Sequence, residues 1–367
     1  MISNEDMGAS IDSRKMNNKL VFVTLSLDLD NVILAHSETW AIAFGRHFRN
    51  VDIYALRIGE VSEQILGEKF ECREFGGGTF FRRLVAFIKI MAAVSRIIRE
   101  HKNIDFVFYH MCPVLAALMA PLIRLTRIRQ ALWYSHSNIS ASLNFASKVV
   151  NEIYTPIESS FPLELGTKVK VVGHGIDTSQ FEKIDFKSER KDIAYLGRIS
   201  RIKRLETIIS AISEITSNRP RLHLIGPVFD IEYKNEIIRH ARIMEVVVCF
   251  QSEIGKRDVP SILSQYSMFY SGNPRTLDKS AVEAALSGTV ILSEDSSILK
   301  AFSLDIYWKS QFIEGIPKLE QQIQSIMKMN VQELEALRSS MASTARQRHS
   351  LENLSYYICQ NLQNQIS

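Results

Sequence analysis

The chain has 367 residues, a length that suggests two domains at roughly 150 residues per domain. Hydrophobic residues make up 46% and charged residues 23%, a balance that excludes a disordered chain, a collagen-like repeat and an acidic tail protein. The formal net charge of +4 is too small to indicate nucleic acid as a partner.

The N-terminal residues 1–18 are polar and lack the apolar core of a signal peptide, so we expect a flexible leader there. No apolar run reaches the ~20 residues that a membrane-spanning helix needs. The four cysteines form no C-x-x-C pair, which argues against a disulfide framework and against a zinc site. Together these features predict a cytoplasmic protein.

Short apolar strands alternate with helical segments through the first half of the chain. The segment LVFVTLSLDLD, from Leu20, predicts a buried strand followed by a polar loop. The later elements of this half are a helix at 38–48, a strand at 51–58, a long helix at 80–101, a strand at 104–110, a helix at 113–126 and a strand at 131–136. This alternation predicts βαβ units and a parallel sheet.

The alternation restarts after a boundary near 173–181. Strands are expected at 192–198, 221–227, 246–250, 268–273 and 289–295, with helices at 204–215, 233–244, 259–266 and 279–288. The result is an α/β fold with two Rossmann-like domains, in which ligands bind beyond the carboxyl ends of the strands and in the cleft between the domains. The stretch 331–367 predicts helices with an apolar face that docks on the rest of the protein.

A basic turn follows the strand that ends at Leu196. Gly197 allows a tight turn, and Ser200 can cap a helix that starts near Lys203. A helix N-terminus favours an anion, and Arg198 and Lys203 add two positive charges there. The segment predicts a diphosphate cradle, and the alternative is a solvated basic turn.

Two other segments carry candidate ligand groups. Glu283, in the segment 278–288, can accept hydrogen bonds from two ribose hydroxyls, and the alternative is an ordinary exposed helix glutamate. His174 lies between two glycines after a strand, where the sharp turn exposes backbone amides. Its alternative is a plain turn between domains.

Five segments in one order resemble retaining family 4 glycosyltransferases: GHGIDTSQF, GRISRIKRLETIISAI, LHLIGP, DVPSILSQYSMFYSG and DKSAVEAALSGTVIL. The resemblance covers about residues 20–365, and its specific motifs lie in 171–290. It implies a GT-B fold, in which two Rossmann-like domains face each other across a cleft and a C-terminal helix crosses back. The expected domains are 19–176 together with a helix at 345–367, and 177–344.

The resemblance also implies roles for individual residues. Arg198 and Lys203 would bind the donor diphosphate and, with His136 near the donor sugar, carry the catalysis. The implied donor-binding residues are Gly197, Gly226, Gln251, Glu283, Lys279, Ser280 and His174. The acceptor-side candidates are Asp28, His36 and His110; for Asp28, which forms an Asp-x-Asp pair with Asp30, two plain loop carboxylates are an equal alternative.

The chemistry implied by the resemblance is stabilisation of a leaving nucleoside diphosphate by fixed cations and amide dipoles. A divalent metal often fills this role elsewhere, but no metal and no cofactor is expected here. The family often carries a glutamate eight residues before Glu283, where this chain has Arg275. Either Asp278, Lys279 and Ser280 replace that sugar contact or catalysis is weakened, and we expect an active enzyme.

The stretch 75–135 is basic, with nine Lys or Arg against two acidic residues, and phenylalanines and leucines are interleaved with them. One interpretation is an amphipathic face for an anionic membrane surface, which would suit a lipid-linked acceptor. The other is an ordinary Rossmann helix with its apolar face in the core.

The expected function is transfer of a sugar, with retention, from a UDP- or GDP-sugar to a glycan or lipid-linked acceptor in surface polysaccharide or lipopolysaccharide biosynthesis. The expected location is the cytoplasm, with peripheral attachment at the inner face of the plasma membrane under the amphipathic interpretation. Two alternatives are a nucleotide-sugar epimerase of the same fold and a catalytically degenerate nucleotide- or glycan-binding subunit, the latter motivated by Arg275.

Overall fold

The computed structural model describes residues 17–29, 36–77, 80–181, 191–312 and 315–363, which form two compact units. The N-terminal unit runs to Gly175 and includes the chain from Leu351 onward, and the C-terminal unit is Ile176–Ser350. Most of the expected leader, residues 1–16, lies outside the described residues. The return to the first unit comes at Leu351 rather than at residue 345, because the preceding helix continues to His349.

The N-terminal unit is built on one sheet of seven strands, all parallel, in the order β3-β2-β1-β4-β5-β6-β7. The strands are β1 (Asn17–Leu27), β2 (Phe48–Ile58), β3 (Phe70–Glu74), β4 (Phe106–His110), β5 (Arg129–Trp133), β6 (Glu152–Thr155) and β7 (Val169–Val171). The sequence analysis missed β3 and β6, and it expected β7 as the strand before His174 without giving its bounds. β3 lies at a sheet edge and is only partly buried, so it lacks the apolar run that marks an inner strand.

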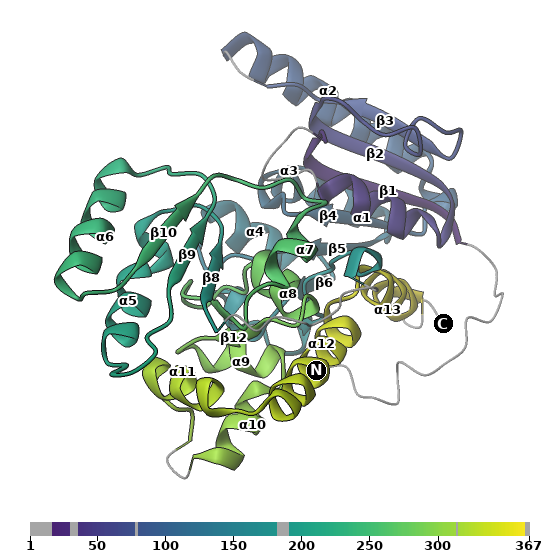
Figure 1. Cartoon of the computed structure of the whole chain (residues 1–367). Coiled ribbons are helices and arrows are strands. Elements are labelled where there is room, and N and C mark those ends of the chain that lie inside the picture. The colour runs from purple at the N-terminus through teal and green to yellow at the C-terminus, as the bar shows by residue number, and fades with distance from the viewer. Residues whose placement is uncertain (1–16, 30–35, 78–79, 182–190, 313–314, 364–367) are drawn as a thin grey trace. The chain divides into compact units, whose positions relative to one another are not determined.

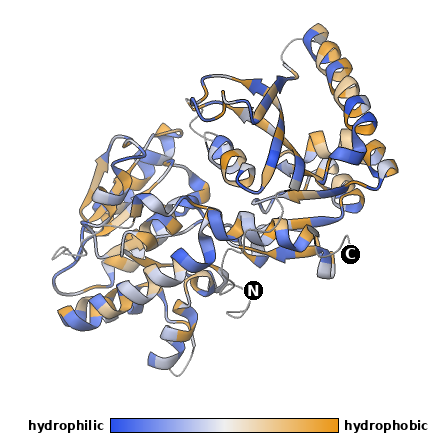
Figure 2. Ribbon diagram, turned by 90° about the vertical axis from the view of Figure 1, so that its right-hand side faces the viewer, coloured by the Kyte–Doolittle hydropathy of each residue, from blue (hydrophilic) through white to orange (hydrophobic). Residues whose placement is uncertain are grey.

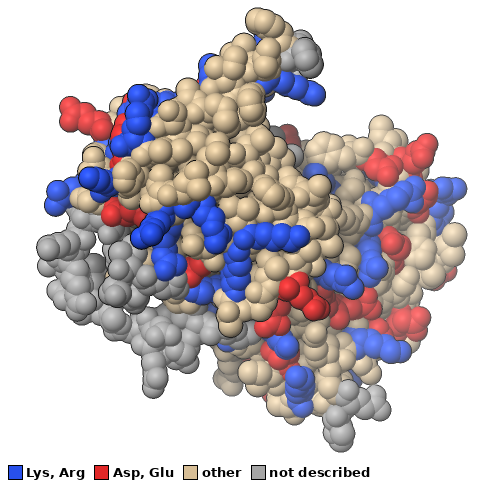
Figure 3. Space-filling view, turned by 180° about the vertical axis from the view of Figure 1, so that it is seen from behind, with Lys and Arg blue, Asp and Glu red and all other residues tan. Residues whose placement is uncertain are grey.

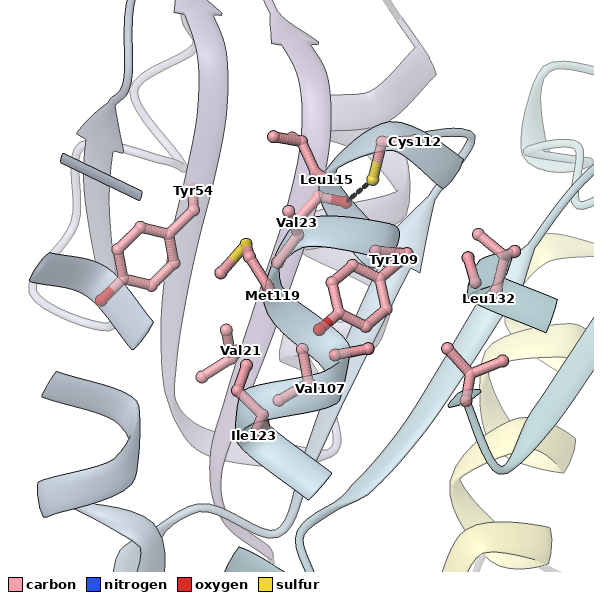
Figure 4. Close-up of a cluster of buried hydrophobic side chains, with 14 of the residues drawn as sticks. Val21, Val23, Tyr54, Val107, Tyr109, Cys112, Leu115, Met119, Ile123 and Leu132 are labelled. Carbon is pink, nitrogen blue, oxygen red and sulfur yellow. Dashed lines mark hydrogen bonds between the residues drawn. The ribbon is translucent and has the colours of Figure 1, made fainter. Parts of the chain in front are cut away.

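Helices cover both faces of this sheet (Figure 1). They are α1 (His36–Gly45), α2 (Phe80–Arg99), α3 (Pro113–Ile123), α4 (Ala141–Val149) and α13 (Leu351–Gln363). Side chains of α2, α3 and α4 share one apolar core with the sheet, and those of α1 and α13 share the other. In the first core, Met119 and Ile123 pack near Val21, and the Cys112 thiol donates a hydrogen bond to the Val23 carbonyl at 3.2 Å (Figure 4).

The C-terminal unit holds a second parallel sheet of five strands in the order β10-β9-β8-β11-β12. Its strands are β8 (Ile193–Leu196), β9 (Leu222–Ile225), β10 (Val248–Gln251), β11 (Met268–Tyr270) and β12 (Val290–Leu292). Its helices are α5 (Leu205–Ser213), α6 (Ile231–Ile243), α7 (Val259–Leu263), α8 (Lys279–Leu286), α9 (Ser296–Ala301), α10 (Leu304–Gln311), α11 (Leu319–Lys328) and α12 (Val331–His349). The two predicted Rossmann-like domains are therefore present.

Candidate functional site

The C-terminal sheet reverses its winding direction at β8, which lies between β9 and β11. Open parallel sheets bind ligands at such a switch point, beyond the carboxyl ends of the strands. The loops after β8 and β9 join directly there, because the Gly197 amide donates to the Ile225 carbonyl and the Ile199 amide to the Pro227 carbonyl, each at 2.9 Å.

Two predicted site glycines make this join possible. Gly197 and Gly226 have φ angles of 151° and 136°, in the region that favours glycine. A Cβ atom on Gly226 would lie 2.3 Å from the Gly197 carbonyl oxygen. The two loops can therefore approach this closely only because Gly226 lacks a side chain, while a Cβ atom on Gly197 would lie 2.9 Å from the Tyr195 hydroxyl.

The prediction that Ser200 caps the helix that starts near Lys203 is wrong. Residues Arg201–Lys203 form a single 3-10 turn, Arg204 adopts a left-handed conformation with φ of 50°, and α5 begins only at Leu205. Ser200 makes no side-chain capping bond; the first amide of α5 instead donates to the Tyr233 hydroxyl at 2.8 Å. The local pattern suggested a cap, but the left-handed residue separates the turn from the helix.

Lys203 is buried and paired. Its Nζ atom lies 2.8 and 2.7 Å from the two carboxylate oxygens of Asp278, the residue just before α8. One of these oxygens also accepts a hydrogen bond from the Asn273 side chain at 3.0 Å. Since β8 and β11 are adjacent strands, this ion pair joins the loops that follow them and lies across the switch point.

Arg198 occupies a different environment. Its side chain is exposed, and the guanidinium carbon lies 5.7 Å from the ring centroid of Phe229, in the loop after β9. This is a cation–π distance. The Tyr195 hydroxyl donates to the Arg198 carbonyl at 2.8 Å and fixes the backbone of the turn. Of the two predicted cations, one is thus held in place by a carboxylate and the other lies against an aromatic ring in solvent.

The first two turns of α8 carry three of the predicted donor-binding residues. Glu283 is largely buried and pairs with Lys279 one turn earlier at 3.3 Å, while Ser280 is half-buried. Partial desolvation, followed by repulsion from Lys279, lowers the pKa of Lys256, and the charge of Glu283 opposes this effect. Lys256 therefore lies within electrostatic reach of the two α8 side chains. The sequence analysis missed it, although a Gly-Lys-Arg run after β10 marks the position.

Gln251 lies at the end of β10, and its carbonyl accepts a hydrogen bond from the Gly226 amide at 3.1 Å. The structure thus brings together two of the expected donor-binding residues, Gly226 and Gln251. The side-chain Nε2 atom of Gln251 lies 3.2 Å from Nδ1 of His223, within hydrogen-bond distance. Arg275, in the position of the missing glutamate, has a φ of 59° and donates its amide to the Asp295 carboxylate at 2.9 Å; its side chain is exposed.

In the N-terminal unit, three predicted histidines gather at the carboxyl ends of the central strands. His110, at the end of β4, is fully buried, and its Nδ1 atom lies 3.3 Å from the Ser37 hydroxyl. The His36 ring lies 5.3 Å from the His110 ring. Burial first, and then the charges of His36 and His174, hold the pKa of His110 well below its usual value, so its imidazole is neutral at pH 7.

The other predicted residues of this unit lie nearby or at its surface. The ring of His174 lies 6.4 Å from Trp133, and Trp133 lies 4.8 Å from Trp40. His136 is exposed, with its ring 5.9 Å from Tyr134. Asp28 follows β1 with its carboxylate against Gly59, and its expected companion at position 30 lies outside the described residues.

Within the described part of the chain, no group of three or more His, Cys, Asp or Glu side chains is arranged to hold a metal ion. No helix there is both long enough and apolar enough to cross a bilayer.

Searches of family models and of curated proteins give no match. Solved structures do match over nearly the whole chain. HepE (Alr3699) of Anabaena, in complex with UDP, is 13% identical with a TM-score of 0.69 and covers 94% of this chain and 100% of its own. A glycosyltransferase from Rickettsia africae is 12% identical with a TM-score of 0.69, covering 96% and 99%. The lipopolysaccharide outer core galactosyltransferase WaaB is 10% identical with a TM-score of 0.65, covering 95% and 100%.

At these identities the likeness establishes the fold. Both Rossmann-like units and the returning C-terminal helix are present in this chain, and two of these three solved structures, the Rickettsia africae protein and WaaB, are glycosyltransferases. The chain therefore has the two-domain α/β fold of the GT-B glycosyltransferases.

Proposed function

We propose that the protein is a retaining, metal-independent glycosyltransferase that uses a UDP- or GDP-sugar. The observation that carries the proposal is the Lys203–Asp278 ion pair across the switch point of the C-terminal sheet. Asp278 directly precedes α8, the helix that carries Glu283. The solved structure of HepE with UDP-glucose, which has the same fold, supports a nucleotide-sugar as the donor. The acceptor is a glycan or a lipid-linked intermediate of surface polysaccharide or lipopolysaccharide assembly, met at the inner face of the plasma membrane.

Asp278 holds the Lys203 ammonium group in one orientation. An ammonium group has three N–H donors, and the two carboxylate oxygens of Asp278 engage no more than two of them. The remaining donor can bind a phosphate oxygen of the donor sugar nucleotide without breaking the pair. Because this cation is already oriented before substrate binds, it stabilises the charge that develops on the leaving diphosphate without reorganisation.

The remaining residues take supporting roles in this proposal. Arg198 provides the second, mobile cation, and Glu283 binds the ribose hydroxyls. We assign His136 to the donor sugar, and Asp28, His36 and the neutral His110 to the acceptor. The new bond forms on the face of the sugar that the diphosphate leaves, and the leaving phosphate takes the acceptor proton, so no protein nucleophile is required.

The test is a thermal-shift panel of nucleotide-sugars followed by product analysis. A ligand at 100 times its dissociation constant stabilises the folded state by about 2.7 kcal/mol, which is easily measured. The proposal expects stabilisation by one family of nucleotide-sugars and a new glycoside when acceptor is present. Isomerisation of UDP-N-acetylglucosamine without acceptor would indicate the epimerase instead. Binding with neither hydrolysis nor transfer, for any donor, would indicate the degenerate binding subunit.

We expect Glu283→Ala to weaken nucleotide binding about 10- to 100-fold, because a hydrogen bond to a charged group is worth roughly 1.5–3 kcal/mol. Calorimetric titration with the best nucleotide from the panel measures the effect. Glu335→Ala, which removes an exposed glutamate from α12 of the same unit, is the matched control and should bind normally. Unchanged affinity in the Glu283 variant would remove this residue from the site.

A further inference from the structure

Helix α2 has two apolar faces, and only one of them meets the core. Ala86, Ile90 and Val94 are buried against the sheet of the N-terminal unit. On the opposite side, four large apolar residues recur at the i, i+3, i+4, i+7 spacing of a single helical face, which we name the α2 stripe: Phe81, Leu84, Val85 and Ile88. Their side chains are between 37% and 72% exposed.

An exposed stripe of this kind is unusual, since the outer face of a surface helix is normally polar. Phe87, beside the stripe, is also exposed. The first turns of α2 project from the unit, with hydrophobic residues alternating with hydrophilic ones along the helix (Figures 1 and 2). The stripe therefore presents apolar side chains away from the core of the unit that carries it.

The charged residues of α2 itself are all basic. The segment from Phe75 to Arg99 contains no Asp or Glu, and Arg82, Lys89 and Arg96 recur every seven residues along one flank of the helix. Arg96 pairs with Glu71 at 3.1 Å and with Glu100 at 2.9 Å, and Lys89 donates to the backbone carbonyl of Glu74 at 3.2 Å. Arg82 and Arg83 are exposed at the N-terminal end of α2. The segment 106–151, which forms α3 and α4, also lacks any acidic residue but has four Lys or Arg.

A second apolar row lies on α3, which packs against α2. Val114, Leu118 and Leu122 recur every four residues on its outer side, each at least 38% exposed, and Leu125 follows at 80%. Figure 3 shows α2 projecting above a broad stretch without charged side chains, bordered by Lys and Arg and, at the left edge, also by Asp and Glu. Apolar side chains rimmed by basic ones match a bilayer with anionic headgroups, in which the rings enter the interface and the charges meet phosphate.

We propose that the α2 stripe, with its basic flank and the neighbouring row on α3, docks the protein on the surface of an anionic lipid bilayer. Two copies of this predominantly basic face would repel each other, so a self-associated pair of such faces is disfavoured by charge. The inference deepens the proposed function by giving a lipid-linked acceptor a place to meet the enzyme, but its own evidence is independent of the donor site.

The experiment is sedimentation of the full chain with vesicles of neutral phosphatidylcholine, alone or with 30% phosphatidylglycerol. We expect binding to the anionic vesicles only, and weaker binding at 1 M salt, where the screening length falls to about 3 Å. The pair Arg82→Gln and Arg83→Gln should weaken it roughly twentyfold, at about fivefold for each basic residue. The triple change Phe81→Ser, Leu84→Ser and Ile88→Ser should reduce it at least tenfold.

The matched control is the pair Ile231→Ser and Ile243→Ser, which removes two equally exposed isoleucines from α6 of the other unit. Control binding should equal that of the unchanged chain. No binding to anionic vesicles, equal binding to neutral ones, or an equal loss in the control would overturn the proposal. So would a dimer, detected by light scattering, that the α2 changes convert to monomer. Nucleotide stabilisation is measured on every variant, so failure of the donor site is recognised separately from failure of docking.

Discussion

Lys203→Ala should lower the rate of sugar transfer by about 10²- to 10³-fold, the loss that follows removal of one preorganised donor to a developing anion. The ammonium is buried and directed by Asp278, so water cannot easily take its place. Arg198→Ala should have an effect of the same order, since it removes the second cation from the same leaving group. Steady-state kinetics with saturating donor measures both.

The structure supplies a matched control for this experiment. Lys309 also pairs with an aspartate in the C-terminal unit, at 3.9 Å from Asp305, but its side chain is 57% exposed. Lys309→Ala should leave transfer unchanged, because exposed pairs contribute little and this one is far from the β8 and β11 loops in the chain. Near-normal turnover in both the Lys203 and the Arg198 variants would reject the diphosphate role.

A second comparison separates the roles of the two partners. If Asp278 acts by orienting Lys203, then Asp278→Asn and Lys203→Ala should not add: the double variant should be no slower than Lys203→Ala alone. Nucleotide affinity and thermal unfolding are recorded for each, because removing one member of a largely buried pair also destabilises the fold. Independent, additive losses would show that Asp278 contacts the substrate by a separate route.

The sequence predicted the parts of this site that depend on local pattern. The strand ends and the tight turn at Gly197 followed from apolar runs and a glycine between neighbouring elements. The Lys203–Asp278 pair did not, because its members are 75 residues apart and meet only through the order of the strands. Lys256 was missed for the same reason. Ser200 shows the opposite error: the local pattern suggested a cap, but one left-handed residue at Arg204 moved the helix start beyond its reach.

In the N-terminal unit, too, features with a local sequence pattern were predicted and features that depend on distant residues were not. Inner strands such as β4 are continuous apolar runs and were predicted, whereas β3 has only half-buried and exposed residues at the sheet edge and was not. His110 was a candidate from its place after a strand. Its neutral state could not be predicted, because the depressed pKa comes from burial and from His36 and His174, which lie 74 and 64 residues away in the sequence.

Gly226→Ala should destabilise the C-terminal unit by about 3 kcal/mol or more, since it combines a strained φ with a steric clash. The new methyl group would lie 2.3 Å from the Gly197 carbonyl oxygen, which is backbone and cannot move without parting the β8 and β9 loops. Those loops carry Arg198 and the Gln251 contact, so nucleotide binding should fall together with stability. Urea unfolding followed by circular dichroism, and the thermal shift with nucleotide, measure the two effects.

Gly315→Ala introduces the backbone strain without a steric clash. Gly315 lies in the same unit with a φ of 102°, but a Cβ atom there would meet nothing within 4 Å. We expect it to cost about 1–2 kcal/mol from the strained conformation alone and to leave nucleotide binding intact. The difference between the two variants is then the energy of forcing the β8 and β9 loops apart. Equal losses in both would mean that the two loops are not in contact in solution, and the donor site as described would lack its central join.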